Sequence, residues 1–508
     1  MTIQDNSNAK SEEKTSCAHT NTAGRKQDLS FLAPHARIYF VGIGGISMSG
    51  LAEISSALGY TAAGSDMHLS HRTHYLEEKG ILIFAGHAAE NLAGFKPDLV
   101  VHTAAILPGN PELAYAAANG IPSVDRARYL GYLTAGFSRV INISGTHGKT
   151  TTTSMASLIL IASGQEPTVH LGAELDAFGS TVHMGRPHEL LVSEACEYQR
   201  SFLQFYSTTA AITNIDYDHV DCFKSLSEVI DVFAEFTQKI SEGGTLVIPA
   251  FDPNAAEAVR RMPRYRKPLG LSMPGIVTTG LKGDIFAVTG EHADVYADNL
   301  TYHGGYPSFD VFIDGIFYVH IDLHVPGDHN VYNALTAIAC SHINGGTPEA
   351  AASVLAAFTG AEGRYSIKGK YKGATVVADY AHHPAAARAT LAAASHIPHN
   401  KTWVVFQPLT FNRTQVLFDD FVQSLLPCGH VLFAEIFSDR EINTGTVSSA
   451  QLADKINELG GNAEFFADKN DIIPRLNELV HEGDLILVLG PEDIRELADE
   501  MIKIEAGQ

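Results

Sequence analysis

Two patterns of hydrophobic residues alternate along most of this chain. Short apolar runs, among them residues 38–41, 140–143 and 485–489, have the length and composition of buried strands. Stretches with helical periodicity, such as residues 46–58 and 149–162, lie between them. This alternation of strands and helices predicts an α/β fold, in which helices cover largely parallel sheets.

The strand-and-helix pattern starts afresh twice, which predicts three domains. We expect the first domain over residues 35–138, the second over 139–345 and the third over 346–508. Residues 1–34 are expected to form a mobile tail, because their first thirty residues contain no apolar run of strand or helix length. A length of 508 residues agrees with this division, since domains average roughly 150 residues.

Composition narrows the class of protein. Hydrophobic residues make up 45% of the chain and charged residues 18%, as in ordinary soluble globular proteins. The 35 Lys and Arg residues face 57 Asp and Glu, and this net charge of −22 disfavours nucleic acid and anionic membranes as partners. The first thirty residues contain no apolar core of a signal peptide, and no run of eighteen apolar residues occurs, so we expect neither a secretion signal nor membrane insertion. Five scattered cysteines without a CxxC pair favour a reducing, cytoplasmic environment.

A glycine-rich turn links the first strand to the first helix. Gly42, Gly44 and Gly45 would let backbone N–H groups approach a diphosphate at the helix N-terminus. Asp66, which ends the next strand, is a candidate partner for a ribose hydroxyl. A tight turn that merely needs glycine, followed by an exposed turn aspartate, is the alternative interpretation.

A second strand-to-helix turn carries the more specific nucleotide motif. GK[ST] at such a junction surrounds triphosphate oxygens with amide groups and one ammonium, and it directs a hydroxyl to Mg²⁺. Ile143 stands where the first glycine of the complete motif belongs. The sequence therefore predicts ATP binding by Gly145, Thr146, His147, Gly148, Lys149, Thr150 and Thr151.

Three further strand ends carry polar side chains. Glu194 and Glu197 offer hard oxygen ligands for a metal, although a surface carboxylate pair is the alternative. The segment 214–221 could hold a second cation, or it could simply be a turn rich in Asn and Asp. For the neighbouring His382 and His383 we favour a helix-capping or phosphate-edge role over a metal site, because adjacent side chains point in different directions.

Six motifs together resemble the Mur ligase family. In chain order they are VGIGGISMSGLAE, SGTHGKTTTT, EACEYQRSFL, TNIDYDHVD, GDHNVYNALTA, and DYAHHP followed by FQP and RT. They extend from residue 38 to about residue 415. The resemblance implies a Rossmann-like first domain for a UDP-linked substrate, a central P-loop-type ATP domain, and an α/β third domain that closes on the site.

The resemblance also implies a reaction. The GIGGI opening is typical of the branch that uses ATP and Mg²⁺ to join L-alanine to the lactyl carboxylate of UDP-N-acetylmuramate in peptidoglycan synthesis. A lactyl carboxylate is a poor electrophile, so phosphoryl transfer from ATP would give an acyl phosphate, which the amino group of alanine attacks. The two small-molecule partners would be UDP-N-acetylmuramate and L-alanine.

Residue roles follow from the matching motif positions. Lys149, Glu197 and His219 would be catalytic, with Thr150 and Glu197 on one Mg²⁺ and His219 on a second. His329 and Asn330 would lie near the adenine or ribose, and Arg364 and Asp379 would contact the nucleotide from the third domain. The sugar nucleotide and alanine would be held by Gly42, Gly44, Gly45, Asp66 and Arg413.

Four departures from the family pattern fall in or just before the third domain. Leu409 replaces a histidine linked with the amino-acid site, Gly363 replaces one arginine of a pair, and Ala378 replaces an acidic residue. Residues 490–493 read Gly-Pro-Glu-Asp in place of GAGD. They leave open a ligase for another amino acid or a ready-made peptide, and a non-catalytic nucleotide-binding regulator.

Overall fold

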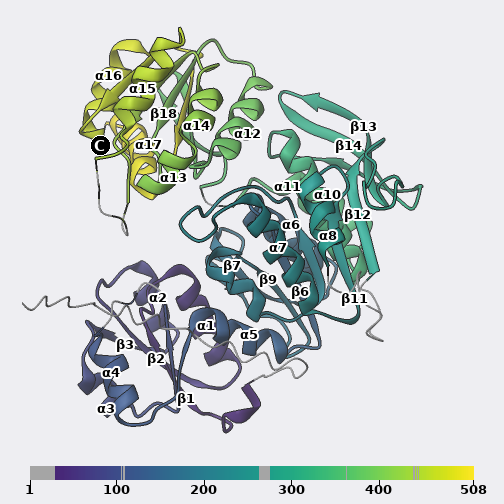
Figure 1. Ribbon diagram of the computed structural model, residues 1–508, viewed down its shortest axis with the longest axis vertical. Coiled ribbons are helices and arrows are strands. Elements are labelled where there is room, and N and C mark those ends of the chain that lie inside the picture. Colours follow the sequence, from purple (N-terminus) through teal and green to yellow (C-terminus); the bar gives the residue numbers. More distant parts are fainter. Residues whose placement is uncertain are drawn as a thin grey trace, which may run out of the picture.

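The protein folds into three lobes that follow one another along the chain (Figure 1), as seen in a computed structural model. The structure describes residues 29–103, 106, 109–262, 275–361, 363–438, 441, 443 and 445–507. Each lobe is built on its own sheet, with helices against it. The structure therefore confirms the predicted α/β fold class and its division into three domains.

The first lobe contains a five-stranded, fully parallel sheet in the order β3-β2-β1-β4-β5. β1 is buried over four of its five residues, as expected for a strand covered on both faces. Its strands are β1 (Arg37–Val41), β2 (Thr61–Asp66), β3 (Leu82–Ala85), β4 (Leu99–His102) and β5 (Ser123–Asp125). Its helices are η1 (Leu29–Phe31), α1 (Ile46–Ala57), α2 (His71–Glu78), α3 (Ala89–Phe95), α4 (Pro111–Ala118) and α5 (Arg126–Ala135).

The central lobe has a ten-stranded sheet in the order β15-β14-β13-β12-β11-β10-β6-β9-β7-β8. Its core is parallel, whereas β8, β14 and β15 pair antiparallel with their neighbours. The strands are β6 (Arg139–Ser144), β7 (Thr168–Leu175), β8 (Ser180–His183), β9 (Leu190–Glu194), β10 (Ser207–Ile212), β11 (Ile240–Pro249), β12 (Gly275–Leu281), β13 (Val295–His303), β14 (Tyr306–Ile313) and β15 (Ile316–Asp322). The helices are α6 (Lys149–Ala162), η2 (Tyr198–Gln204), α7 (Leu226–Phe236), η3 (Thr237–Lys239), α8 (Pro253–Arg261), α10 (Asp328–Ile343) and α11 (Pro348–Ala357).

The third lobe has a six-stranded sheet in the order β16-β17-β21-β18-β19-β20, in which only the edge strand β16 runs antiparallel to its neighbour. The strands are β16 (Ser366–Tyr371), β17 (Ala374–Asp379), β18 (Thr402–Phe406), β19 (His430–Ala434), β20 (Ala463–Phe466) and β21 (Leu485–Leu489). The helices are α12 (Pro384–Ser395), α13 (Phe411–Val416), α14 (Phe418–Leu425), α15 (Ser449–Glu458), η4 (Lys469–Asp471), α16 (Ile472–Leu479) and α17 (Glu492–Glu505).

The end of the central lobe differs from the boundary predicted at residue 345. Helix α11 packs against α6 and β15, and Ala351, Leu355 and Phe358 belong to the core of the central lobe. The sheet of the third lobe starts only at Ser366. The predicted boundary is too early because α10 is not the last helix of the central lobe, and the apolar face of α11 is buried on that lobe as well.

The segment expected to be a tail also differs at its end. Most of residues 1–34 lies outside the described residues, but Leu29–Phe31 forms a short helix. Leu29 is buried in the core of the first lobe, and the ring of Phe31 packs edge-on against Tyr132 at 5.4 Å. These two apolar side chains attach the last residues of the segment to the domain.

Candidate active site

The loop between β6 and α6 has the geometry of a phosphate-binding turn. Gly148 immediately precedes α6 at φ +83°, a conformation that L side chains rarely adopt, and a Cβ there would lie 2.4 Å from Asn333 Oδ1. The segment after β10 holds the loop in place, because the amides of Thr146 and His147 donate to Asn214 O at 3.0 Å and Asn214 Oδ1 at 2.9 Å. The free amides at the start of α6 can therefore face an anion.

The side chain of Lys149 folds back onto this loop. Its ammonium donates to Gly145 O and Thr146 O, at 2.5 and 3.1 Å, and to Glu197 Oε2 at 3.0 Å. Burial lowers the pKa of Lys149, but Glu197 and the neighbouring acidic groups outweigh it and raise that pKa above its usual value. The cation is thus kept charged at the phosphate-binding turn.

Thr150 meets a different carboxylate from the one expected. Its hydroxyl donates to Glu194 Oε2 at 3.1 Å, and Glu194 Oε1 accepts the amide of Gly172 at 2.7 Å. Glu194 is in register with Ile143 on the adjacent strand, next to the loop, whereas Glu197 lies beyond the strand end. Glu194 was a candidate metal ligand by sequence, and the motif match named only Glu197. The parallel pairing of β6 and β9 is what places Glu194 beside Thr150.

Glu197 belongs to a second group of potential metal ligands. Side-chain atoms of Cys196, Glu197 and His219 lie within 4.8 Å of one another, and His219 Nε2 is 3.7 Å from Glu197 Oε1. Burial lowers the pKa of His219, so its imidazole is neutral, and its Nδ1 atom is buried without a hydrogen-bond partner. Hydroxyl and carboxylate oxygens at Thr150 and Glu194, with this imidazole nearby, fit a divalent cation beside the loop.

A polar cluster connects the loop to the third lobe. His147 Nε2 lies 3.3 Å from Asp216 Oδ2, and the rings of His147 and His383 are 4.8 Å apart. The bond with His147 is the largest influence on Asp216 and lowers its pKa to about 2. His383 Nδ1 accepts the amide of Ala385 at the start of α12, which confirms the predicted helix-capping role.

Arg413 forms a buried ion pair between the third lobe and the central lobe. Its Nε atom donates to Asp218 Oδ1 at 2.8 Å, and both side chains are buried, at 3% and 8% exposure. The same guanidinium donates to Leu409 O at 3.3 Å. The structure therefore pairs Arg413, expected at the amino-acid site, with a carboxylate of the central lobe.

The guanidinium of Arg495 lies beside Gly363, where the family pattern has an arginine. A Cβ on Gly363 would lie 2.2 Å from Nη1 of Arg495, a residue of α17. The guanidinium carbons of Arg364 and Arg495 each lie 5.3 Å from the ring centre of Tyr380. Burial raises the pKa of Asp379, while Arg364 and Arg495 act in the opposite direction. Two guanidinium groups thus surround Tyr380 and Asp379 despite the glycine.

The start of α10 lies against the phosphate-binding turn. Asn330, one of the expected nucleotide contacts, is buried and accepts from Asn333 Nδ2 at 3.0 Å. Asn333 Oδ1 in turn accepts from Thr152 at 3.2 Å. Asn333 was not among the predicted site residues, although it stands one helical turn after Asn330 on the same face of α10. His329 lies exposed beside Gly327.

Asp66 binds the backbone of the glycine turn in the first lobe. Gly44 N donates to Asp66 Oδ2 at 2.8 Å, and Gly42 N donates to Ser65 O at 2.8 Å. Gly45 is the residue before α1 and makes no side-chain cap. Asp66 therefore fixes the turn, and the predicted contacts of these residues with the sugar nucleotide stay predictions.

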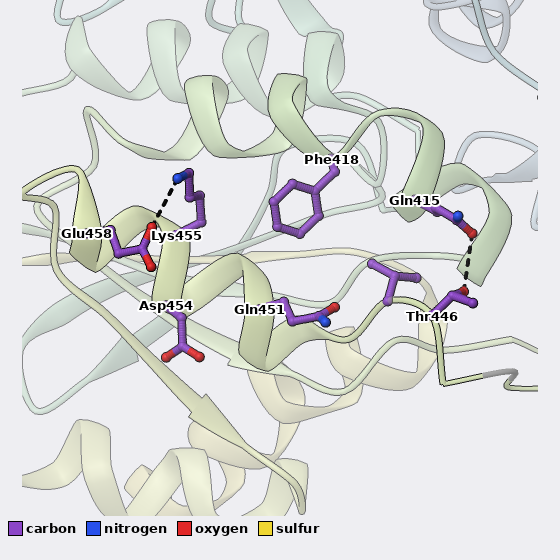
Figure 2. A pocket seen from close by; sticks show the side chains of 8 residues that line it. Gln415, Phe418, Thr446, Gln451, Asp454, Lys455 and Glu458 are labelled. Atoms are coloured by element: carbon purple, nitrogen blue, oxygen red, sulfur yellow. Dashed lines mark hydrogen bonds and ion pairs between the residues drawn. The ribbon is translucent and has the colours of Figure 1, made fainter.

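A cavity of about 470 Å³ lies elsewhere, in the third lobe between α14 and α15 (Figure 2). Lys455 Nζ pairs with Glu458 Oε2 at 3.0 Å, and Thr446 donates to Gln415 at 3.2 Å, so its polar groups largely bind one another. It is lined by Gln415, Phe418, Thr446, Val447, Gln451, Asp454, Lys455 and Glu458. None of the predicted site residues is among them.

Models of one protein family match successive parts of the chain. They describe the Mur ligase family catalytic domain over residues 37–138, the Mur ligase middle domain over 143–341, and the Mur ligase glutamate ligase domain over 363–491. The chain belongs to the Mur ligase family. The resemblance inferred from the six motifs is confirmed.

Curated relatives of this Mur ligase match it over nearly its full length. A UDP-N-acetylmuramate–L-alanine ligase of Caldanaerobacter subterraneus is 40% identical over 468 residues, which are 92% of this chain and 97% of that protein. The ligase of the same name from Acetivibrio thermocellus is 39% identical over 480 residues, 94% and 98% of the two chains.

Solved structures of other Mur ligases share the fold. The UDP-N-acetylmuramate-alanine ligase MurC of Thermotoga maritima superposes with a TM-score of 0.73 at 27% identity, covering 93% of this chain and all of that one. The MurF ligase of Thermotoga maritima in complex with ADP gives 0.57 at 17% identity, covering 94% and 98%. Among the described residues, no helix is long and apolar enough to cross a membrane.

Proposed function

We propose that this protein joins L-alanine to the lactyl carboxylate of UDP-N-acetylmuramate at the expense of ATP, giving UDP-N-acetylmuramoyl-L-alanine, ADP and phosphate. The observation that carries the proposal is the near full-length similarity to L-alanine ligases at about 40% identity. The phosphate-binding turn with its charged Lys149 supports the ATP-dependent step. The product is a precursor of peptidoglycan.

Activation of the carboxylate falls to the central lobe. The amides at the start of α6 and the ammonium of Lys149 would stabilise charge on the phosphoryl group as it moves to the lactyl oxygen. Mg²⁺, when bound, neutralises charge on the phosphate oxygens, and Thr150, Glu194, Glu197 and His219 are the side chains that would hold it. Lys149 now pairs with Glu197, and it would exchange part of that contact for phosphate.

Amide formation falls to the junction with the third lobe. His329, Asn330, Arg364 and Asp379 would bind the nucleotide, while the glycine turn and Asp66 would hold the sugar nucleotide in the first lobe. Arg413 would help to form the alanine site through its contact with Asp218. Closure of the third lobe would exclude the water that otherwise hydrolyses an acyl phosphate.

The test is phosphate release from ATP and Mg²⁺ with UDP-N-acetylmuramate and L-alanine, glycine, L-serine or no amino acid, with the product identified by mass. We expect the largest rate and an amide product with L-alanine. Preference for another amino acid would assign the Leu409 departure to specificity. No turnover with intact ATP binding would favour a regulator that retains the fold.

Two variants separate the sites. Lys149→Ala should lower ATP turnover by at least about a hundredfold, because it removes the charge at the phosphate turn, and should leave UDP-N-acetylmuramate binding intact. Equal loss of ATP turnover and of UDP-N-acetylmuramate binding would contradict the division of work between lobes.

Leu409→His should lower the KM for L-alanine, since imidazole can hydrogen-bond where leucine cannot. An unchanged KM would place Leu409 outside the alanine site.

A further inference from the structure

Arg126 is a half-buried cation for which the structure offers little compensation. It is the first residue of α5, and its Nη1 atom donates to Ser47 Oγ at 3.1 Å. Among the residues that the structure describes, no carboxylate forms an ion pair with it. Burial lowers the pKa of Arg126, but a guanidinium stays charged at neutral pH. A half-buried cation without a carboxylate partner is suited to bind an anion.

The surroundings of Arg126 belong to two lobes. Ser47 lies in the first turn of α1, directly after the glycine turn, and its Oγ atom is 3.1 Å from Nε2 of His170 on β7. His170 is 3% exposed, and its burial lowers its pKa to about 4, so it is neutral and does not replace the missing anion. The imidazole also contacts Ser47 O at 3.3 Å, which fixes the serine beside the arginine.

The helix that carries Arg126 packs against a segment next to the proposed phosphoryl-transfer site. Helix α5 packs on η2, the segment that follows Cys196 and Glu197. His170 pairs with Ser193, the residue before Glu194. The guanidinium is therefore placed between the glycine turn of the first lobe and the residues around Lys149.

We propose that Arg126 binds the lactyl carboxylate of UDP-N-acetylmuramate, with Ser47 as a positioning residue for its guanidinium. This assignment rests on the proposed function, because the sugar nucleotide must extend from the glycine turn to the phosphate turn for its carboxylate to be phosphorylated. Four of the five N–H donors of Arg126 remain for a planar, two-oxygen acceptor. The diphosphate would instead lie at the backbone amides of the glycine turn.

The test compares two ligands without ATP. UDP-N-acetylglucosamine has the same nucleotide and diphosphate as UDP-N-acetylmuramate and lacks the lactyl carboxylate. We expect Arg126→Met to weaken calorimetric binding of UDP-N-acetylmuramate about tenfold to hundredfold and to leave UDP-N-acetylglucosamine binding unchanged. Arg128→Met is the matched control, because Arg128 is exposed on the same helix, and it should change neither affinity.

Two further variants guard against a folding defect. Arg126→Lys keeps the charge and should lose part of the carboxylate affinity, since an ammonium cannot form the paired hydrogen bonds. Ser47→Ala should weaken the carboxylate ligand selectively, and Ser47→Thr should restore it. Equal losses for the two sugar nucleotides, or no loss for either, would overturn the assignment. Failure of the unaltered protein to bind UDP-N-acetylmuramate would overturn the proposed function and the assignment with it.

Discussion

The first and third lobes join the central lobe in opposite ways. Helix α1 of the first lobe lies directly on β7 and β8, where a Cβ on Gly50 would come within 2.8 Å of Val182 Cγ2. One hydrophobic core cluster includes residues of both lobes, from Leu29 to Ala293. Apolar side chains pack closely across this joint, and a few hydrogen bonds, such as Ser47–His170 and Ser180–Glu53, lie among them. Separating the two lobes would therefore expose apolar surface.

The joint with the third lobe is polar. Its described contacts include the Arg413–Asp218 pair, the approach of His383 to Asp216, and a bond between His383 Nε2 and Tyr217 O at 3.2 Å. The buried members of the two core clusters in the third lobe all follow residue 364. Polar contacts exchange for water at a small net cost, so this joint is the one suited to opening and closing around substrates.

The largest effect is expected from Asp218→Ala in the polar joint. The substitution leaves the Arg413 guanidinium buried and unpaired, which should destabilise the contact by about 3–5 kcal/mol. Calorimetric unfolding would show the third lobe melting earlier and separately. Adding Arg413→Met should recover much of the loss, because no unpaired charge remains; a double variant as unstable as the sum of the two would contradict this explanation.

Acid should weaken both joints, through one buried imidazole in each. Burial lowers the pKa of His170 and of His383 to about 4, against about 6.5 in the unfolded chain. As the pH falls below 6.5, the unfolded state therefore takes up the proton before the folded state does. The free energy of unfolding decreases between pH 6.5 and pH 4, by up to about 3 kcal/mol for each histidine. Urea unfolding at pH 7 and pH 4 measures the loss.

The variants His170→Asn and His383→Asn should each remove one part of this pH dependence. Asn is also a good helix cap, so the second variant keeps the acceptor at the start of α12. A pH dependence that neither variant alters would place its origin outside the two joints.

A smaller effect is expected from Gly50→Ala in the apolar joint. The added methyl group would press on Val182 and Thr181, and overpacking of this kind costs about 1–3 kcal/mol. The first and central lobes share a core and should unfold together, and the temperature of this thermal transition should be lower in the variant. Gly94→Ala is the control, since nothing lies within 4 Å of that Cβ in α3, and it should leave the transition unchanged or raise it slightly.

The smallest effect concerns Arg495, the arginine beside Gly363. Arg495→Met should weaken ATP binding about fivefold, on the order of 1 kcal/mol, because a cation near Asp379 and Tyr380 is lost. Binding of UDP-N-acetylmuramate should not change, since we propose that this ligand binds at the glycine turn of the first lobe. Arg475→Met, which removes a half-buried arginine paired with Glu464, is the matched control. Equal effects of the two variants would show that Arg495 has no role at the nucleotide.

The sequence by itself determined the parts of this protein that are local. A strand, a glycine turn and a helix are adjacent in the chain, so β6, the phosphate turn and α6 could be read from the run around Lys149. The capping role of His383 follows from its place before Pro384. The order of the motifs was enough to predict the family.

Tertiary structure decided which distant side chains meet. The choice of Glu194 over Glu197 for Thr150 depends on the register of β9 against β6, and Arg413 reaches Asp218 across 195 residues of sequence. Arg495 fills the space beside Gly363 only because α17 packs on the sheet that begins there. Sequence periodicity specifies which face of an element is buried, whereas the partner on that face is fixed by how the whole chain packs.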